Sequence, residues 1–254
     1  MLLILGLGYT ARAVAAHAGM AVVGTTRDGR DGTIPFDAAD GALAAATHVL
    51  SSVPPDADGD PVLRRYGAAL GGKWLGYLSS TGVYGDAGGA WVDESAPADR
   101  GRRANRNAAD AAWLALGARV FRLPGIYGPG RSALDRVAAG EAHRTGIPGQ
   151  VFSRVHVDDI ATGVVAAFAA PAGAYNLADD EPAPQDDVVA FAARLLGLPP
   201  PPFVPVESLS PMARGFHAEN RRVANGKAKR VLGWCPTYPD YRAGLRALHH
   251  FRSP

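Results

Sequence analysis

Short apolar runs alternate with alanine-rich stretches along most of this chain, and this alternation constrains its fold more than any other feature. The helical patterns lie at 10–17, 61–70, 105–116 and 158–170. Apolar runs bounded by turn residues are typical of strands buried on both faces. The runs are LLIL (2–5), AVVGT (21–25), THVLSSV (47–53), KWLGYLSS (73–80), ARVFRLPG (118–125) and GAYNL (173–177). Alternation of this kind predicts right-handed βαβ units and a parallel sheet covered by helices on both faces.

The pattern changes after about residue 180. A predicted helix at 187–196 is followed by the proline-rich stretch LPPPPFVP (198–205), which is typical of a stiff connector. A polar segment with several arginines and lysines comes next. We expect this part of the chain to form a smaller lobe against the sheet.

Composition excludes several classes of function. The chain has 254 residues and a formal net charge of +2, so charge gives no reason to expect a nucleic-acid or membrane-surface partner. Cys235 is the only cysteine, which rules out an internal disulfide and favours a reducing compartment. No apolar run approaches the roughly 20 residues of a membrane helix, so we expect a cytoplasmic protein. Neither metal-ligand spacing nor a hydrolase elbow nor a P-loop is present.

A glycine motif directly follows the first predicted strand. Positions 6–11 read Gly-Leu-Gly-Tyr-Thr-Ala, a G-x-G-x-x-A pattern that opens the first predicted helix. Gly6 permits a tight turn, Gly8 lets backbone approach a pyrophosphate, and Ala11 lets the helix pack close to the strand. The motif predicts a dinucleotide site whose lining includes Tyr9 and Thr10, although a purely structural turn is the alternative.

The end of the second predicted strand favours NADP(H) over NAD(H). An acid there would accept the ribose 2′-hydroxyl, but residues 24–27 read Gly-Thr-Thr-Arg. Thr26 can donate a hydrogen bond and Arg27 can hold a 2′-phosphate bidentately. Arg12 is a second candidate for this contact, and Asp37 is a candidate for the adenine amino group. The alternatives are a solvated loop arginine and an ordinary turn aspartate.

Five further stretches resemble the extended short-chain dehydrogenase/reductases, the NAD-dependent epimerase/dehydratase family. In chain order they are SSTGVYG (79–85), RLPGIYGPGR (122–131), VHVDDIA (155–161), YNL (175–177) and LGW (232–234). The resemblance implies an α/β protein with a Rossmann-type, doubly wound parallel sheet of about seven strands. We expect this domain in residues 1–178, with a candidate excursion into the substrate lobe near 128–152. The small C-terminal substrate-binding lobe is expected in residues 179–254.

The resemblance also implies roles for single residues. Ser80 matches the family's catalytic Ser/Thr, whose hydroxyl would hydrogen-bond the substrate oxygen undergoing redox, and Thr81 follows it. Arg131 and Tyr84 are candidate substrate contacts, although Tyr84 also fits core packing, and Asp158 and Asp159 fit a helix cap and scaffold. By position, the residues expected beside the cofactor are Ser51, Ser52, Val53, Pro124 and Gly125.

The family's catalytic tyrosine and lysine, four residues apart on one helix face, are absent. None of the eight tyrosines has a lysine four positions later, and the two places fall on Arg102 and Arg106. Arg106 could replace the lysine, but a guanidinium stays protonated, so Arg102 cannot replace the tyrosine as an acid. Ser80 or Thr81 with a water, Tyr127 and His156 are alternative proton donors, each with a purely structural alternative. Tyr127 is also a candidate substrate contact.

Four arginines gather in the same segment. Arg100, Arg102, Arg103 and Arg106 either form a solvated surface or line the cleft, where they would suit an anionic substrate. We rank three functions: an atypical NADP(H) reductase or dehydrogenase for a small or sugar-like substrate, a non-catalytic NADP(H)-sensing or scaffold module, and a nucleotide-sugar epimerase or dehydratase. The expected oligomeric state is a monomer or a homodimer.

Overall fold

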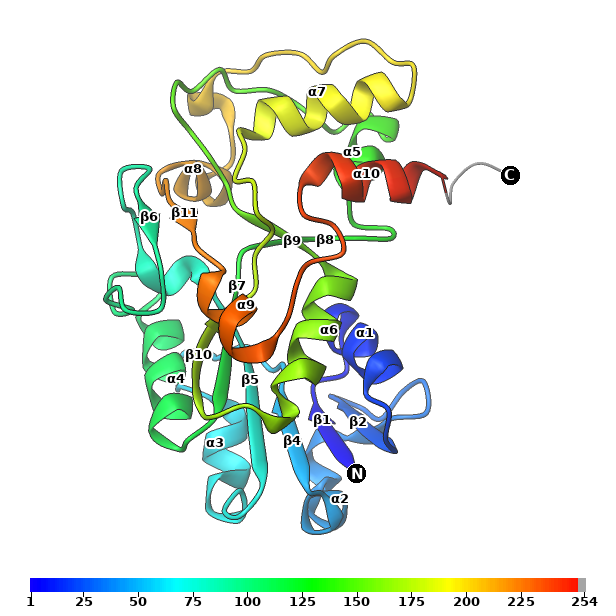
Figure 1. The fold of residues 1–254 in the computed structure, drawn as a ribbon, viewed down its shortest axis with the longest axis vertical. Helices are drawn as coiled ribbons and strands as arrows, with labels where there is room; N and C mark the ends of the chain where they lie inside the picture. The colour runs from blue at the N-terminus through cyan, green and yellow to red at the C-terminus, as the bar shows by residue number, and fades with distance from the viewer. Residues whose placement is uncertain (251–254) are drawn as a thin grey trace.

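The centre of the molecule is a seven-stranded parallel sheet, seen in the lower half of Figure 1. The computed structural model describes residues 1–250. The order across the sheet is β3 (Ile34–Pro35), β2 (Val22–Thr26), β1 (Leu2–Leu5), β4 (His48–Ser51), β5 (Trp74–Ser80), β7 (Arg119–Leu123) and β10 (Gly173–Asn176). The predicted Rossmann-type sheet of about seven strands is therefore confirmed.

The order of the strands reverses beside β1. Leu2 of β1 pairs with Val22 on one side and with His48 on the other, and all four side chains of β1 are fully buried. Because β2 and β4 leave β1 in opposite directions across the sheet, the connections after β1 and β4 diverge. A divergence of this kind opens a crevice at the carboxyl ends of the strands.

Helices cover both faces of the sheet. One layer contains α1 (Tyr9–His17), α6 (Val157–Ala166) and α9 (Gly226–Leu232), and the other contains α2 (Asp40–Ala45), α3 (Pro61–Tyr66) and α4 (Ala104–Ala115). Each layer buries its apolar side chains against the sheet in a separate core cluster. Within residues 1–250 there are also five short 3₁₀ turns: η1 (Phe36–Ala38), η2 (Gly67–Ala69), η3 (Thr81–Tyr84), η4 (Ala167–Ala169) and η5 (Val206–Ser208).

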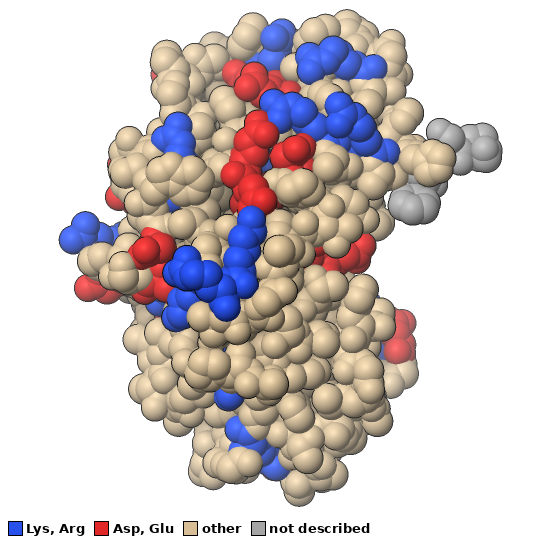
Figure 2. All heavy atoms as spheres, viewed as in Figure 1, with Lys and Arg blue, Asp and Glu red and all other residues tan. Residues whose placement is uncertain are grey.

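A smaller lobe stands above the carboxyl ends of the strands (Figure 1). Its core joins α5 (Ala133–Ala138), α7 (Gln185–Leu195) and α10 (Tyr241–His250), and α8 (Pro211–His217) lies at the same end. Two short ribbons connect it to the sheet, β8 (Gly125–Tyr127) with β9 (Arg154–His156) and β6 (Trp91–Val92) with β11 (Arg222–Val223). On the face of the molecule drawn in Figure 2, charged side chains gather over the upper half, while the lower half is largely uncharged.

The lobe does not coincide with the range 179–254 expected from the sequence. Its core includes α5, which comes from the 128–152 excursion, because the chain leaves β7 through β8 and enters the lobe there. The C-terminal part also returns to the sheet, where Ala228 of α9 and Trp234 pack in the same cluster as β1. Both parts of the chain therefore contribute to both bodies.

A buried ion pair lies behind β5 and β7. Arg122 donates from Nη2 to Asp110 Oδ1 at 2.7 Å and from Nε to Oδ2 at 3.2 Å, and Ser79 Oγ donates to Oδ2 at 2.6 Å. The side chains of Arg122 and Asp110 are 3% and 1% exposed. A buried charge is tolerated only when it is paired and hydrogen-bonded, so this network fixes α4 against the sheet.

We expect Asp110→Ala to lower the free energy of unfolding by about 3–5 kcal/mol, because it leaves the Arg122 guanidinium buried without its carboxylate. Urea denaturation followed by circular dichroism measures the change. Asp99→Ala, at an exposed position, should stay within about 0.5 kcal/mol of the parent. A loss below about 1 kcal/mol for Asp110→Ala would contradict the structural role assigned to the pair.

A second buried carboxyl lies at the junction of the sheet and the lobe. Asp179, three residues beyond β10, is 2% exposed, and neither of its oxygens has a hydrogen-bond partner within the described residues. Burial raises the pKa of Asp179 to about 8, against the opposing charge of Arg154. The native protein therefore holds a proton on this carboxyl that the unfolded chain releases near its ordinary pKa of about 3.9.

This difference gives the pH dependence a definite sign. The native state binds the extra proton between about pH 4 and pH 8, so the stability that the group supplies at low pH is lost as pH rises through that window. We expect Asp179→Asn to raise Tm at pH 8, with a gain on the order of 1 kcal/mol in the free energy of unfolding. Near pH 4 the variant should match the parent. Calorimetric scans of both proteins across this range test it, and a variant less stable than the parent at pH 8 would refute it.

Candidate functional site

The glycine loop after β1 has the form that a bound pyrophosphate requires. Gly6 has φ +89°, and a Cβ there would lie 3.0 Å from Val53, so only glycine fits. Gly8 precedes α1 with an ordinary φ of −88°, and a Cβ there would meet no protein atom within 4 Å. Since neither backbone nor packing requires a glycine at position 8, the open space in front of α1 fits an external group such as a phosphate.

Neighbouring residues hold this loop in place. Thr25 Oγ1 accepts a hydrogen bond from the Gly6 N–H at 3.0 Å, and the Ser52 N–H donates to the Leu5 carbonyl at 2.9 Å. Ala11 is fully buried in the sheet core, which explains the small residue at the end of the motif. The other residues expected near the loop lie beside it: Thr10 and Ser51 are buried, and Tyr9 is at the surface with its hydroxyl donating to the Pro129 carbonyl at 3.1 Å.

The end of β2 carries the residues expected to select the cofactor. Thr26 Oγ1 accepts the N–H groups of Gly29 and Arg30, so its hydroxyl organises its own loop. Arg27 is exposed and makes no hydrogen bond or ion pair to any described residue. Its guanidinium is thus available to a ligand.

The two other candidates of this region are less directly available. The Arg12 guanidinium donates to Asp31 Oδ2 at 3.4 Å in an exposed pair, so a phosphate would compete with that carboxylate. Asp37 lies exposed in η1, and its backbone carbonyl accepts a hydrogen bond from Arg65. The Asp37 carboxylate remains a candidate for an adenine contact.

A cleft of about 240 Å³ opens where β5 and β7 end. Ser80, at the end of β5, accepts the Gly82 N–H at 3.1 Å, and its own hydroxyl proton has no acceptor among the described residues. This proton is free to point into the cleft. The lining residues are Ser80, Thr81, Gly82, Arg102, Arg103, Arg106, Asn107, Leu123, Pro124, Gly125, Val151, Phe152, Ser153, Glu219, Arg221 and Val223.

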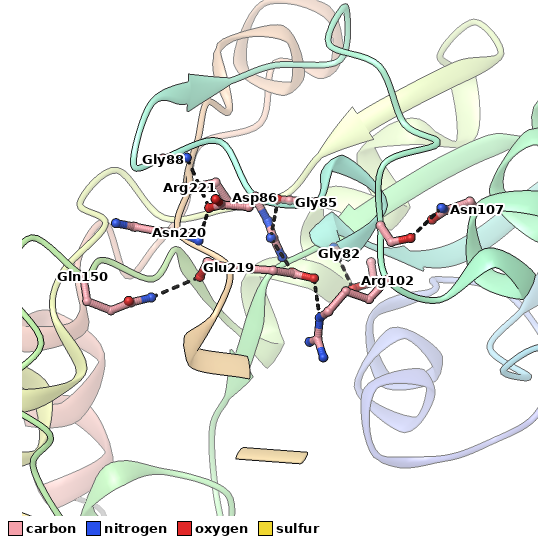
Figure 3. A network of polar contacts seen from close by, with 12 residues as sticks. Gly82, Gly85, Asp86, Gly88, Arg102, Asn107, Gln150, Glu219, Asn220 and Arg221 are labelled. Carbon is pink, nitrogen blue, oxygen red and sulfur yellow. Dashed lines mark hydrogen bonds and ion pairs between the residues drawn. The ribbon is translucent and has the colours of Figure 1, made fainter. Parts of the chain in front are cut away.

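The positions assigned to the missing pair do not share one helix face. The helix α4 begins at Ala104, so Arg102 lies outside it, whereas Arg106 is in its first turn. Arg102 Nε donates to Glu219 Oε1 at 2.5 Å, and Arg221 Nη1 donates to Oε2 at 2.7 Å (Figure 3). Arg102 therefore joins the sheet domain to the segment before β11, and the four-residue spacing carries no catalytic geometry here.

Among the described residues, Glu219 is the one carboxylate in the lining of this cleft. Partial burial opposes its ionisation, but the hydrogen bonds from Arg221 and Arg102 outweigh that effect and lower the pKa of Glu219. The group is therefore an anion near neutral pH and cannot supply a proton. A water or a hydroxyl must do so in any reaction within this cleft.

A wider cleft of about 850 Å³ continues from the first under the lobe, and the two share Gly125, Phe152 and Ser153. Tyr127 and Arg131, the candidate substrate contacts, both lie in its lining. The Tyr127 hydroxyl is buried without a hydrogen-bond partner within residues 1–250, and burial raises the pKa of Tyr127 far above its usual range. Tyr127 is consequently a poor proton donor near neutral pH.

Two other candidates lie outside both clefts. Tyr84 is buried, donates to Asn176 Oδ1 at 2.8 Å and accepts from Arg122, so it is a core residue and not a substrate contact. His156 is 2% exposed, its Nδ1 accepts the Asp158 N–H, and burial lowers its pKa. The Asp159 carboxylate accepts backbone N–H groups at 237 and 238, in a structural role.

Sequence reasoning did not identify the segment 219–221, which completes the cleft. Asn220 bonds to Asp86, Gly149 and Val151, and Gln150 donates to the Glu219 carbonyl, which brings 219–221 against two distant loops (Figure 3). These contacts span 69 to 134 residues and follow no short-range motif. The cluster of arginines after Glu219 was the one visible signal.

No helix within residues 1–250 is both long and apolar enough to cross a bilayer. In the same part of the chain, no group of three or more His, Cys, Asp or Glu side chains is placed to hold a metal ion.

No family model matches this chain. It is 38% identical over 138 residues to a 3-diazoavenalumate denitrifying reductase from a Streptomyces species, a match that spans 50% of this chain and 45% of that protein. A conserved protein of unknown function from Silicibacter pomeroyi is 42% identical, with a TM-score of 0.90, over 100% of this chain and 99% of that one.

More distant solved structures have the same fold. Human epimerase family protein SDR39U1, in complex with NADPH, is 17% identical with a TM-score of 0.74 over 98% of this chain and 99% of its own. Thermus thermophilus UDP-glucose 4-epimerase, in complex with NAD, is 19% identical with a TM-score of 0.74 over 100% and 99% of the two chains. The protein therefore belongs to the family of the conserved Silicibacter pomeroyi protein, and it has the fold of the NAD-dependent epimerase/dehydratase family, the extended short-chain dehydrogenase/reductases.

Proposed function

We propose that the protein is an NADP(H)-dependent oxidoreductase that acts on a small substrate. One observation carries this proposal: the glycine loop with open space at Gly8 and the Ser80 hydroxyl with its uncommitted proton lie at the same carboxyl edge of one parallel sheet. Ligands of open parallel sheets bind at this edge, beside the point where strand order reverses. The partial match to a protein named as a reductase agrees with the proposal.

Different residues around the crevice would bind different parts of the dinucleotide. The N–H groups of the first turn of α1 and the open space at Gly8 would hold the pyrophosphate. Arg27 would hold a 2′-phosphate, since β2 ends in a basic residue and not in an acid. Pro124 and Gly125 line the cleft at the end of β7, where the nicotinamide end would lie. The nicotinamide supplies or accepts a hydride when it is bound.

The chain's own residues then act on the substrate. Ser80 would donate its free proton in a hydrogen bond to the substrate oxygen, which polarises a carbonyl and stabilises charge that develops on it. Arg106, in the first turn of α4, lines the same cleft as Ser80 and would hold a polar group of the bound ligand there. With no side-chain acid available in the cleft, the proton comes from water held at Ser80.

The glycine loop allows binding to be separated from folding. We expect Gly8→Ala to leave Tm unchanged, because its Cβ enters open space, and to weaken NADPH binding at least tenfold by occupying the phosphate position. We expect Gly6→Ala to lower Tm, because a side chain at φ +89° is strained and contacts Val53. Thermal unfolding and calorimetric titration of both variants measure these effects. Unchanged NADPH affinity in Gly8→Ala would place the dinucleotide elsewhere.

The catalytic part of the proposal is tested by turnover. Purified protein is incubated with NADPH and a panel of aldehydes, ketones and imines, and oxidation is followed at 340 nm. We expect turnover of at least one compound and a fall in kcat of about a hundredfold in Ser80→Ala, the cost of removing one hydrogen-bond donor from a developing oxyanion. Ser95→Ala, at an exposed position, is the matched control.

A second candidate function follows from the lack of an ordinary general acid among the described residues of the cleft lining. Its one carboxylate is ionised and paired with two arginines, so no side chain of the lining is an ordinary general acid. A non-catalytic NADP(H)-binding module fits that observation. NADPH binding without turnover of any compound, in parent and Ser80→Ala alike, would decide for this function.

A further inference from the structure

We propose that the ligand of the smaller cleft is a small organic molecule with a carboxylate or phosphate group, which binds Arg103 and Arg106. The inference rests on the proposed function in one respect, since it names the substrate class of the same cleft. Its physical basis is the charge of the lining and can be tested without turnover.

The lining of the cleft is strongly cationic. Four guanidinium groups, those of Arg102, Arg103, Arg106 and Arg221, face a single carboxylate, that of Glu219, which leaves an excess of three positive charges. The whole chain carries a net charge of only +2, so the excess is a property of this cleft and not of the protein's surface. Charge of one sign in a concave site attracts ligands of the opposite sign.

Glu219 pairs with two of the four arginines. Its Oε1 accepts from Arg102 and its Oε2 accepts from Arg221, which also donates to the Gly85 carbonyl at 2.7 Å. These contacts join three residues of the cleft lining, Arg102, Glu219 and Arg221 (Figure 3). Arg102 and Arg221 are therefore both paired with Glu219, whereas Arg103 and Arg106 make no ion pair with it among the described residues.

Arg103 and Arg106 remain without an anionic partner. Neither makes an ion pair or a side-chain hydrogen bond to any residue in the described range 1–250. The backbone brings them one turn apart, because the Arg106 N–H donates to the Arg103 carbonyl at 2.9 Å. Arg103 is exposed and Arg106 is half-buried, and both line the cleft.

This arrangement differs from that of several arginines elsewhere on the surface. Arg64, Arg65 and Arg242 each hold a carboxylate at 2.6–2.8 Å. Two like charges one turn apart repel each other, and an oxyanion between them would remove that repulsion. A planar guanidinium also matches carboxylate and phosphate oxygens in a bidentate geometry, which lysine does not.

The rest of the lining indicates how such a ligand would be oriented. Ser80, Asn107 and Ser153 add neutral polar groups to a volume of about 240 Å³, which is below the usual range for drug-sized ligands. An anion on Arg103 and Arg106 would anchor a small molecule at the start of α4, within the same cleft as the Ser80 hydroxyl.

The test is a calorimetric titration of the intact protein, saturated with NADP⁺ so that dinucleotide phosphate sites are filled, with inorganic phosphate and with malonate. We expect at least one of the two probes to bind. We expect Arg103→Gln and Arg106→Gln each to weaken binding at least tenfold, a difference of about 1.4 kcal/mol. Arg100→Gln, at an exposed neighbouring position outside the cleft lining, should bind the probe as the parent does.

The pattern of binding distinguishes the two sources of the anion. Phosphate without malonate indicates a phosphorylated substrate, and malonate without phosphate indicates an organic acid. Partial recovery of affinity in Arg106→Lys supports a charge contact at that position. No binding of either probe, or equal binding by the parent and both glutamine variants at unchanged Tm, overturns the proposal.

Failure of this inference can be separated from failure of the proposed function. If NADP⁺ does not bind, the proposed function fails, and the titration is repeated on the free protein with the same variants. A tenfold loss confined to Arg103→Gln and Arg106→Gln would then still establish the anion site.

Discussion

The arrangement of the whole site depends on the burial of β1. Its side chains are fully excluded from solvent, and its backbone pairs with β2 and β4 in parallel register. Because β1 is packed on both faces and paired on both edges, the position of the residue that follows it is fixed. That residue, Gly6, turns the chain at a positive φ and directs α1 back over the sheet. The start of α1 is thus placed at the carboxyl edge by packing alone. The same parallel arrangement brings Ser80 and Pro124 to that edge from β5 and β7.

A second set of contacts gives the crevice its walls. The lobe contains segments from both parts of the chain. Asn220 bonds to Asp86 in the loop after β5, and the Glu219 carbonyl accepts from Gln150 in the loop before β9. These contacts are polar, whereas the contacts that hold the sheet are apolar. Polar contacts at the border of a cleft stabilise less than a buried apolar core, so the lobe side of the site is held less firmly than the sheet side.

The sequence predicted the sheet well because buried strands and a glycine turn are local signals. Six strands were visible as apolar runs, and the motif at Gly6 and Gly8 marked the first crossover. The predicted helix at 105–116 lies within one residue of α4 (Ala104–Ala115). Arg102 precedes that helix, so the four-residue spacing taken from the family resemblance does not put it on one helix face with Arg106. Glu219 could not be found at all, because its role arises from contacts across more than a hundred residues.

The central claim is that the glycine loop and the end of β2 form an NADP(H) site. Calorimetric titration of the purified protein with NADPH and with NADH tests it most directly. The structure predicts one NADPH bound per chain with micromolar affinity, and NADH bound at least about tenfold more weakly because Arg27 has no phosphate to hold, a gap of about 1.4 kcal/mol. No heat of binding with either dinucleotide would contradict the claim.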